Sequence, residues 1–418
     1  MVTAYHQAGR VLFAFICFLT KKWNSPFSMI PTNRRVFLSG PRLLPTREYV
    51  LTEKLLYACK DIKKLYLLVR DKNGSNSIDR MKTLFEDPLF TRLKNERPEF
   101  FKKVIPVNGD VSLPNLGMKL EDEEALLDKV SVVFHAAATV MFNEPLEVPM
   151  KINFEGTKKV LDLCKRMKKI EVFVYISTAY AHTQRQTLEE IVYPPPAEVS
   201  DVYKFIEKHG HDQEETIKFL DGRPSTYTLT KALTESYIAE NHDKVPSIII
   251  RPSADVPLKG WLDNWYGATR VLHAVGMGWN RVNWGEKTNI LDLIPVDYVC
   301  NLTLIAAARC NKLVNESLFT VVFQMAPAYI ADFFLRVTGK EAKYVKIQTK
   351  VSNLRDFLKY FTAHSWIMKS AKARELNSTL SQDDKLQFPC DPADIKWDEY
   401  MRDYCRGIYN TKGKKIIN

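Results

Sequence analysis

The sequence lacks paired cysteines. Its 418 residues include seven cysteines, and none of them forms a Cys-x-x-Cys pair. Neither a disulfide framework nor a metal site is therefore expected, and the protein is predicted to fold in a reducing compartment. With 45% hydrophobic residues, the chain can nevertheless bury a sizeable core.

The sequence also lacks an apolar run of the roughly 20 residues that a membrane-spanning helix needs. The N-terminal apolar run at 11–19 is shorter, and Lys21 and Lys22 follow it at once. A secretory signal would need a small-residue cleavage site there, which is missing. Residues 1–34 are therefore predicted to be an N-terminal extension, which is either a shallow membrane anchor or a segment that packs on the fold or stays mobile.

No Arg/Lys-rich block or aromatic repeat is present, so the sequence does not indicate binding to nucleic acid. Positive charge is nevertheless in excess, with a formal net charge of +11 and a pI of about 9.1. This excess favours anionic ligands such as phosphates, or association with an anionic membrane surface.

From residue 35 onward, short β-branched and apolar runs alternate with amphipathic helical patterns. The alternation predicts an α/β fold, with a doubly wound parallel sheet of the nucleotide-binding, Rossmann-like kind. We expect strands at 36–38, 65–69, 104–107, 130–136, 172–177 and 247–251, and helices at 49–58, 122–128, 153–167 and 225–241. Catalytic groups are expected past the carboxyl ends of the strands.

The alternation stops near residue 311. We therefore predict a dinucleotide-binding reductase domain at 35–310 and a smaller, mostly helical domain at 311–418. Helices rich in aromatic residues are expected at 325–337 and 351–368, where they either form core or line an apolar ligand site.

Glycine is scarce where such a fold needs it most. A dinucleotide-binding turn uses several glycines so that the backbone can approach the pyrophosphate. Here Gly40 is the one glycine in the turn after the first predicted strand, and Pro41 and Pro45 remove backbone donors. Arg42 and Arg47 are candidates to compensate, because guanidinium groups bind phosphate well.

Tyr227 and Lys231 lie four residues apart in a predicted helix, so that both side chains share one face. A phenol exchanges protons poorly at neutral pH unless a nearby positive charge stabilises its phenolate. The pair therefore predicts an acid–base site, although a surface Tyr–Lys pair has the same spacing.

Two further strand ends carry polar candidates for cofactor contacts. Arg70 follows the second strand, where a cation favours NADPH over NADH, although a solvated charge cluster with Asp71 is the alternative. Asp110 and Val111 follow the third strand and fit contacts to an adenine amine, although an Asp that starts a turn is equally compatible.

The fourth and fifth strands end in small or hydroxylated residues. Ala136 and Ala137 let the backbone lie against a flat nicotinamide ribose, whereas the preceding His135 is assigned no chemistry. Thr178 is the preferred hydroxyl to hold a carbonyl oxygen beside Tyr227, with Ser177 in reserve. Hydroxyls that merely cap a strand end are the structural alternative.

Several motifs together resemble a known family. The set Val172–Tyr180, Tyr227–Lys231, Arg251-Pro252-Ser253 and Ile294–Asp297 is similar to extended short-chain dehydrogenase/reductases. A narrower resemblance, to the insect-type fatty acyl-CoA reductases, is carried by His135–Ala138, Ile176–Tyr180, Thr226–Ala232 and Gly260–Asn264. The C-terminal domain of that family is similar at Phe357–Thr362, Trp366 and Trp397–Tyr400. The likeness covers nearly all of the chain after residue 35.

The resemblance implies NADPH-dependent reduction of a long-chain acyl-CoA, through a hemithioacetal and an aldehyde, to a fatty alcohol in lipid metabolism. It implies that Tyr227 donates a proton, that Lys231 lowers the Tyr227 pKa and bonds the nicotinamide ribose, and that Thr178 orients the carbonyl. Pro252 and Ser253 are then among the cofactor-binding residues. The expected location is intracellular, either at the cytoplasmic face of the endoplasmic reticulum or peroxisome or in the cytoplasm; the oligomeric state is left open.

The sequence departs from the family at the glycine-poor turn and at two shortened stretches, after Lys259 and before Met325. Two alternatives stay open, and these departures favour the first. One is a catalytically inactive paralogue that keeps the fold and binds lipid or a partner. The other is an extended short-chain reductase that acts on another carbonyl substrate, such as a sterol or sugar nucleotide.

Overall fold

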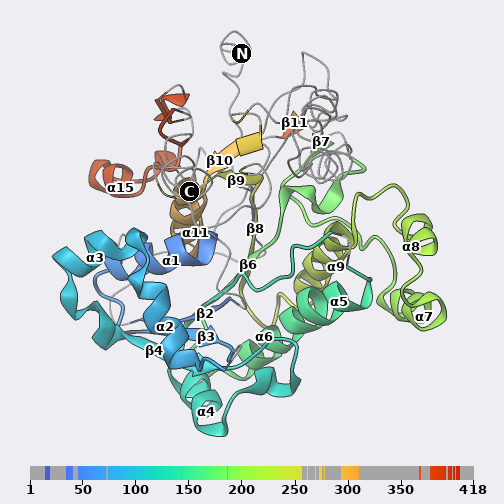
Figure 1. Ribbon diagram of the computed structural model, residues 1–418, viewed down its shortest axis with the longest axis horizontal. Coiled ribbons are helices and arrows are strands. Elements are labelled where there is room, and N and C mark those ends of the chain that lie inside the picture. The colour runs from blue at the N-terminus through green and yellow to red at the C-terminus, as the bar shows by residue number, and fades with distance from the viewer. Residues whose placement is uncertain are drawn as a thin grey trace, which may run out of the picture.

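A seven-stranded sheet organises the described part of the chain (Figure 1). The computed structural model describes residues 15–18, 34–40, 46–71, 74–142, 144–185, 187–256, 261, 269, 273–274, 277, 293–309, 367–368, 377–391, 394–397, 399–400 and 402–404. The strands of this sheet are β1 (Phe15–Phe18), β2 (Arg35–Ser39), β3 (Lys64–Val69), β4 (Val104–Asn108), β5 (Val132–His135), β6 (Val172–Ile176) and β8 (Ser247–Arg251).

The strand order is β1-β8-β6-β5-β2-β3-β4. β2 to β6 and β8 pair in parallel, and the chain moves outward first to one side of β2 and then to the other. The strand order therefore reverses between β2 and β5, which is where doubly wound sheets bind their ligands. The fold class predicted from the sequence is confirmed.

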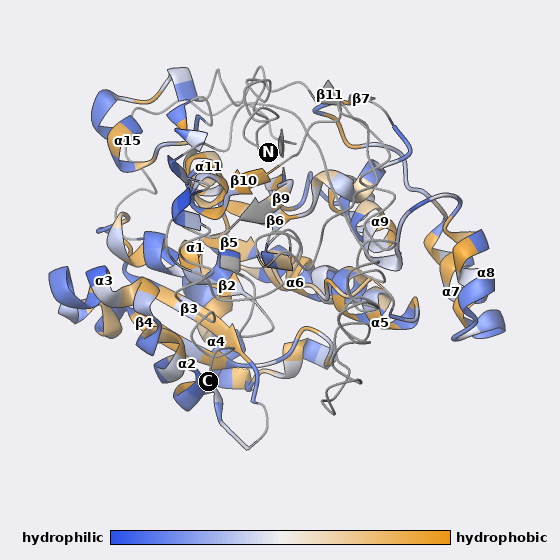
Figure 2. Cartoon of the chain, turned by 45° about the horizontal axis from the view of Figure 1, so that its top comes forward, coloured by the Kyte–Doolittle hydropathy of each residue, from blue (hydrophilic) through white to orange (hydrophobic). Residues whose placement is uncertain are grey.

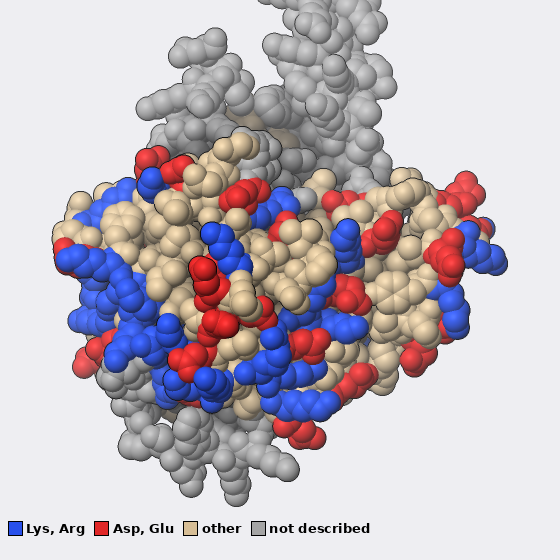
Figure 3. Space-filling model, turned by 90° about the horizontal axis from the view of Figure 1, so that it is seen from below, with Lys and Arg blue, Asp and Glu red and all other residues tan. Residues whose placement is uncertain are grey.

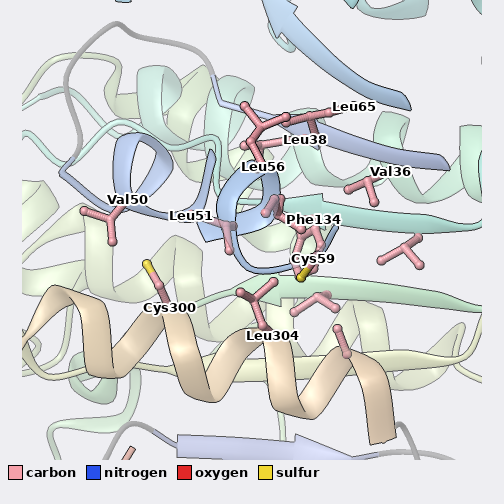
Figure 4. Packing of buried hydrophobic residues seen from close by; sticks show 14 of the residues in the cluster. Val36, Leu38, Val50, Leu51, Leu56, Cys59, Leu65, Phe134, Cys300 and Leu304 are labelled. Carbon is pink, nitrogen blue, oxygen red and sulfur yellow. The ribbon is translucent and has the colours of Figure 1, made fainter. Parts of the chain in front are cut away.

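The sheet separates two hydrophobic cores, because alternate residues of each strand face opposite sides. Val36 and Leu38 of β2 join one core, whereas Phe37 joins the other. On the first face, α11 (Val296–Arg309) lies beside α1 (Thr46–Tyr57). Figure 4 shows Cys300 and Leu304 of α11 pointing toward that layer.

The remaining helices cover both faces and one end of the sheet (Figure 1). The first core also takes side chains from α2 (Ser77–Glu86) and α3 (Thr91–Glu96). The second is covered by α4 (Leu120–Lys129) and α6 (Glu155–Arg166), with the end of α9 (Thr226–Glu240). A third cluster joins α9 to α5 (Glu147–Pro149) and α7 (Val199–His209), which precedes α8 (Gln213–Phe219).

Two small parallel ladders complete the description. β9 (Ala254–Val256) pairs with β10 (Leu293–Pro295), and β7 (Thr187–Leu188) pairs with β11 (Ile367–Met368). The helix predicted at 351–368 is therefore wrong at its end, because those last two residues are extended by pairing with β7. The rest of that helix, and the one predicted at 325–337, lie outside the described residues.

The surface combines apolar and charged side chains. Figure 2 shows blue, hydrophilic residues on the outer sides of α2, α3 and α8 and orange ones in the sheet. Seen from below, Lys and Arg gather toward the left with Asp and Glu among them (Figure 3). Ion pairs such as Lys82–Asp79 at 2.7 Å and Lys168–Asp128 at 3.0 Å show that part of the positive charge is paired locally.

Near the N-terminus, Phe15–Phe18 forms β1, which runs antiparallel to β8 at the edge of the sheet. The other residues of the predicted extension, apart from Arg34, lie outside the described residues. Among the helices that the structure describes, none is both long enough and apolar enough to cross a bilayer.

Candidate active site

Tyr227 and Lys231 lie on α9, which the fold buries along most of its length. The helix begins after Ser225, whose hydroxyl accepts a hydrogen bond from the backbone N–H of Thr228 at 3.3 Å. This N-cap satisfies one of the donors that a helix start leaves free. The Tyr227 side chain is 7% exposed and that of Lys231 is 2% exposed. The predicted pair is therefore not a surface pair.

Lys231 is held against the carboxyl end of β6. Its Nζ donates to the carbonyl oxygen of Ile176 at 2.7 Å and lies 4.5 Å from the centroid of the Tyr175 ring. Burial lowers the pKa of Lys231 to about 7, with help from the positive charge of Arg47, while Glu235 and Glu48 oppose that shift. The amino group of Lys231 can therefore gain or lose a proton near neutral pH.

The two candidate hydroxyls after β6 have different partners. The Thr178 hydroxyl oxygen accepts from the N–H of Tyr180 at 3.3 Å and so begins the short 3-10 helix Ala179–His182. The Ser177 hydroxyl donates to Glu235 Oε1 at 2.5 Å in a fully buried contact. Because Ser177 is committed to Glu235, Thr178 is the one whose proton has no partner among the described residues.

Glu235 is the centre of a buried network that sequence reasoning missed. Arg251 donates to its carboxylate through Nε at 2.9 Å and through Nη2 at 2.7 Å, and His182 Nε2 lies 2.9 Å from Oε2. Burial alone would raise the pKa of Glu235, but the Arg251 charge and the hydrogen bond from His182 outweigh it and lower the pKa to about 2. Extending the four-residue spacing from Tyr227 and Lys231 by one more turn would have found it.

Asn153 is a second residue that the sequence did not indicate. It lies in the π-helical turn Met150–Phe154, a geometry that often marks functional sites. Its Oδ1 accepts from the N–H of Thr139 at 2.8 Å, and its Nδ2 donates to the Thr230 hydroxyl at 3.1 Å. Asn153 therefore joins the loop after β5 to the helix of Tyr227. The sequence indicated only that Asn153 begins a predicted helix.

The end of β2 contacts the residues that follow β5. The backbone N–H groups of Ala136 and Ala137 donate to the Ser39 carbonyl at 3.1 and 3.0 Å. His135 is fully buried, with Nδ1 2.5 Å from the Ser39 hydroxyl and Nε2 2.9 Å from that of Thr157. Burial and the nearby Lys231 charge lower the pKa of His135 to about 3, so it stays neutral. These contacts give His135 a structural role, and no chemistry is assigned to it.

A carboxylate lies at the turn where the sequence predicts phosphate contacts. A Cβ added to Gly40 would lie 2.9 Å from Cγ of Glu48, which is in the first turn of α1 and 8% exposed. The charges of Glu48 and Arg47 both act on the pKa of Lys231, which Glu48 raises and Arg47 lowers. A helix N-terminus ordinarily favours an anion from the ligand, and here a side chain of the protein supplies one. Arg42 lies outside the described residues.

Arg70 and Asp110, predicted to contact different parts of a cofactor, contact each other. Arg70 Nη1 donates to Asp110 Oδ2 at 2.9 Å, while Asp110 Oδ1 accepts from the N–H and hydroxyl of Ser112, each at 2.8 Å. Burial would raise the pKa of Asp110, but these hydrogen bonds and the Arg70 charge lower it. The Val111 side chain is fully buried and packs against Gly156, so Val111 could contact a ligand only through its backbone.

Pro252 and Ser253 follow β8, next to the candidate hydroxyls. The Pro252 carbonyl accepts from the N–H of Ala179 at 2.9 Å. The Ser253 hydroxyl is buried and has no hydrogen-bond partner in the described part of the chain. A buried orphan hydroxyl is costly unless a ligand completes it. This end of the site therefore fits the polar nicotinamide group, whereas the end near Gly40 fits a diphosphate less well.

A cavity of about 620 Å³ lies elsewhere, between α1, α11 and residues 394–400. Its walls carry charges of both signs, including Glu53, Arg92 and Asp297, and Tyr227 and Lys231 are not among its lining residues. The candidate active site is therefore defined by the polar contacts around Lys231 and Glu235 and not by this cavity. Within the described ranges, no group of three or more His, Cys, Asp or Glu side chains is arranged to hold a metal.

The fold and the Tyr–Lys site together define a reductase of the extended short-chain dehydrogenase/reductase kind, whose domain binds a nicotinamide cofactor. The family described as "Male sterility protein" matches residues 49–303 with its NAD-binding part and residues 323–411 with a second part. Fatty acyl-CoA reductase 1 of Xenopus laevis is 34% identical, over 88% of this chain and 82% of that protein. The chain belongs to the fatty acyl-CoA reductase family of oxidoreductases, and the resemblance seen in the sequence is confirmed.

Other comparisons agree. Fatty acyl-CoA reductase 1 of Homo sapiens is 32% identical over 88% of this chain and 82% of its own length. Fatty acyl-CoA reductase wat of Drosophila melanogaster is 28% identical over 91% and 84%. The terminal R domain from the myxalamid PKS-NRPS pathway has the same fold, with a TM-score of 0.60 at 18% identity, covering 93% of each chain. The reductase domain of a nonribosomal peptide synthetase from Mycobacterium tuberculosis has a TM-score of 0.55 at 17% identity, over 98% of this chain and 96% of that one.

Proposed function

We propose that this chain reduces long-chain fatty acyl-CoA to the fatty alcohol with NADPH. One thioester, two NADPH and two protons then give one alcohol, one free CoA and two NADP⁺. The observation that carries the proposal is the buried Lys231 ammonium on the same helix face as Tyr227, at the carboxyl end of β6. The curated relatives, named fatty acyl-CoA reductases, supply the substrate class.

The roles of the side chains follow from their contacts. Tyr227 donates the proton to the carbonyl oxygen that gains negative charge, and Lys231 stabilises the phenolate left behind. Thr178, whose oxygen already accepts from Tyr180, directs its own proton to the same carbonyl oxygen. The bound cofactor supplies the hydride. The orphan Ser253 hydroxyl is proposed to hold the nicotinamide group in place.

The preference for NADPH is proposed from the ends of β3 and β4. Arg70 is partly exposed, with a 27% exposed side chain, and its Nε has no hydrogen-bond partner among the described residues. Asp71 is the acidic residue that would otherwise bond a ribose hydroxyl. It accepts from the N–H of Ser77 at 2.7 Å and from Asn108 Nδ2 at 3.0 Å. Arg70 is paired with Asp110 through Nη1 only, and a partly exposed cation of this kind beside an occupied carboxylate favours a 2′-phosphate.

A place at the cytoplasmic face of the endoplasmic reticulum or peroxisomal membrane, or in the cytoplasm, is proposed with this activity. It rests on the apolar substrate and on the net charge of +11, which favours an anionic lipid surface. Flotation of the purified chain with liposomes of neutral or anionic lipid tests the membrane part of the proposal. Equal recovery with both lipids would contradict the role of charge.

The contact of Gly40 with Glu48 favours a second candidate function. A carboxylate beside the cofactor's phosphate position repels a diphosphate. The second candidate is a non-catalytic relative that binds lipid without reducing it. This candidate requires that NADPH does not bind, whereas the first proposal requires that it does.

One experiment separates the two candidates. NADPH binding is measured by fluorescence with NADH as control, and palmitoyl-CoA reduction is followed as loss of NADPH and gain of alcohol. We expect binding and turnover, with Tyr227→Phe about 100- to 10,000-fold slower at unchanged NADPH affinity. Tyr203→Phe, on α7, is the matched control and keeps full activity. Absence of NADPH binding would support the non-catalytic candidate.

A further inference from the structure

Three successive apolar residues lie in the loop between β5 and α5, and the last of them, Phe142, contacts the ring of Tyr227. The ring of Phe142 meets that of Tyr227 edge-on, with centroids 5.4 Å apart at 64°. Val140 and Met141, which precede it, are 43% and 42% exposed. An apolar surface is thus continuous with the group expected to protonate the substrate.

Polar contacts hold this loop in place against α9. Asn153 accepts from the Thr139 N–H at 2.8 Å and donates to the Thr139 carbonyl at 3.2 Å. The Thr139 hydroxyl donates to Glu144 at 2.5 Å, and the Glu144 carbonyl accepts from the Thr226 hydroxyl at 3.2 Å. Thr226 directly precedes Tyr227, so the loop and the phenol keep a fixed relation. Figure 1 shows α5, which the loop enters, beside α9.

Two of the most exposed apolar side chains in the described ranges lie in a different setting. Ile217 on α8 and Leu386 on α15 (Gln382–Gln387) are 69% and 83% exposed, each on a helix surface. Single exposed apolar residues are common and need no ligand. Val140 and Met141 differ because a buried asparagine and a buried threonine fix them beside a candidate catalytic group.

We propose that Val140, Met141 and Phe142 form the contact surface for the alkyl chain of the substrate where it leaves the reacting carbonyl. The inference rests on the proposed function, since it takes Tyr227 as the group that meets the carbonyl oxygen. The carbonyl carbon bears an alkyl chain and a CoA thioester. The amides of CoA would lose hydrogen bonds against an apolar surface, whereas an alkyl chain gains free energy there.

The test is the double variant Val140→Ser, Met141→Ser, with Ile217→Ser as the matched control. Both target positions are exposed, so the thermal midpoint should equal that of the wild type. We expect KM for palmitoyl-CoA to rise about tenfold, while KM for NADPH stays unchanged. The inhibition constant of free CoA, which lacks the alkyl chain, also stays unchanged. The control variant leaves all three constants as they are.

An unchanged KM for palmitoyl-CoA would overturn the inference, as would an equal weakening of free CoA, which would place the CoA moiety on this loop. If the wild type reduces no acyl-CoA, the proposed function fails, and equilibrium dialysis with labelled palmitoyl-CoA then decides the inference. A tenfold weaker binding by the double variant supports the alkyl surface. Equal binding by both proteins, or binding by neither, contradicts it.

Discussion

The two ends of the candidate site differ in how their charges are partnered. At the α9 end, Glu235 is neutralised by Arg251, and Lys231 is bonded to the end of β6. At the β2–α1 end, Glu48 lies against Gly40 at the position where a diphosphate would place its own negative charge. The α9 end holds the charges that the proposed proton transfer needs, whereas Glu48 at the β2–α1 end would repel a diphosphate.

This difference indicates which part of a dinucleotide site tolerates change. Proton transfer depends on a few side chains at fixed distances, and a small displacement there removes activity. Phosphate binding is spread over several contacts, so that a cation such as Arg47 can offset a lost glycine. The difference predicts large effects of substitutions at the α9 end and small ones at the α1 end.

The largest effect is expected for Lys231→Met. Without the ammonium, the phenolate of Tyr227 loses its stabilising charge, and reductase activity should fall about 1,000-fold. Lys218→Met on the exposed face of α8 is the control. Assays of palmitoyl-CoA reduction measure both variants, and activity within tenfold of the wild type would show that Lys231 is dispensable.

The same lysine predicts a pH dependence. Its pKa of about 7 means that the ammonium form is lost as the pH rises through that value. The wild-type kcat/KM should therefore be highest below pH 7 and fall above it, because kcat/KM reports the free enzyme. A profile that stays flat between about pH 6 and 8, roughly the range over which a group with this pKa changes charge, would contradict the assignment.

Glu235→Ala should destabilise the fold more than any other substitution at this end. It removes the carboxylate that balances the buried charge of Arg251, and breaking a buried ion pair in this way typically costs about 3–5 kcal/mol. The exposed Glu240→Ala on the same helix is the control and should change the free energy of unfolding by less than about 0.5 kcal/mol. Urea unfolding measures both. A small loss for Glu235→Ala would mean that the network contributes little.

Lowering the pH should reduce the free energy of unfolding, because burial lowers the pKa of His135 and His182. The folded-state pKa of His135 is lowered to about 3, so between the unfolded value near 6.5 and pH 3 the unfolded chain binds one more proton. Stability is then lost as the pH falls, by about 1.4 kcal/mol per pH unit. His182, with a pKa also lowered by burial, adds to the same range. His135→Gln should flatten the dependence in part, and an unchanged slope would exclude His135 as its source.

The smallest effect is expected at the α1 end. Glu48→Gln removes the negative charge beside Gly40 and should tighten NADPH binding about fivefold, as expected for one charge at a partly shielded distance. Glu53→Gln, on the same helix but paired with Arg92, should leave the affinity unchanged. Fluorescence titration measures both. Weaker binding by Glu48→Gln would mean that Glu48 supports the cofactor site.

Much of the fold could be predicted because its signals are local. The strands predicted at 104–107 and 247–251 differ from Val104–Asn108 and Ser247–Arg251 by at most one residue. Their apolar, β-branched runs are bounded by turn residues, and a buried parallel strand needs little else. The extended pairing of Ile367–Met368 was missed, because its partner β7 lies far away in the sequence.

The site was predictable to the extent that one element carries it. Tyr227 and Lys231 share a helix, and the helical period alone places them on one face. The hydrogen bond from Ser177 to Glu235 was not predictable, because 58 residues separate the two. The same holds for Arg70 and Asp110, which are 40 residues apart and neutralise each other. The roles proposed for these residues toward a cofactor stay predictions.

The sequence by itself determined the doubly wound sheet, the family and the Tyr–Lys pair, since hydrophobic period and motif spacing act along the chain. Only the tertiary structure decided that Lys231 is buried with a pKa near 7, that Glu48 lies against Gly40, and that Phe142 meets Tyr227. The physical reason is that desolvation, charge proximity and ring contacts depend on distance in space. These distances are set where the carboxyl ends of β2, β5 and β6 lie side by side in the sheet.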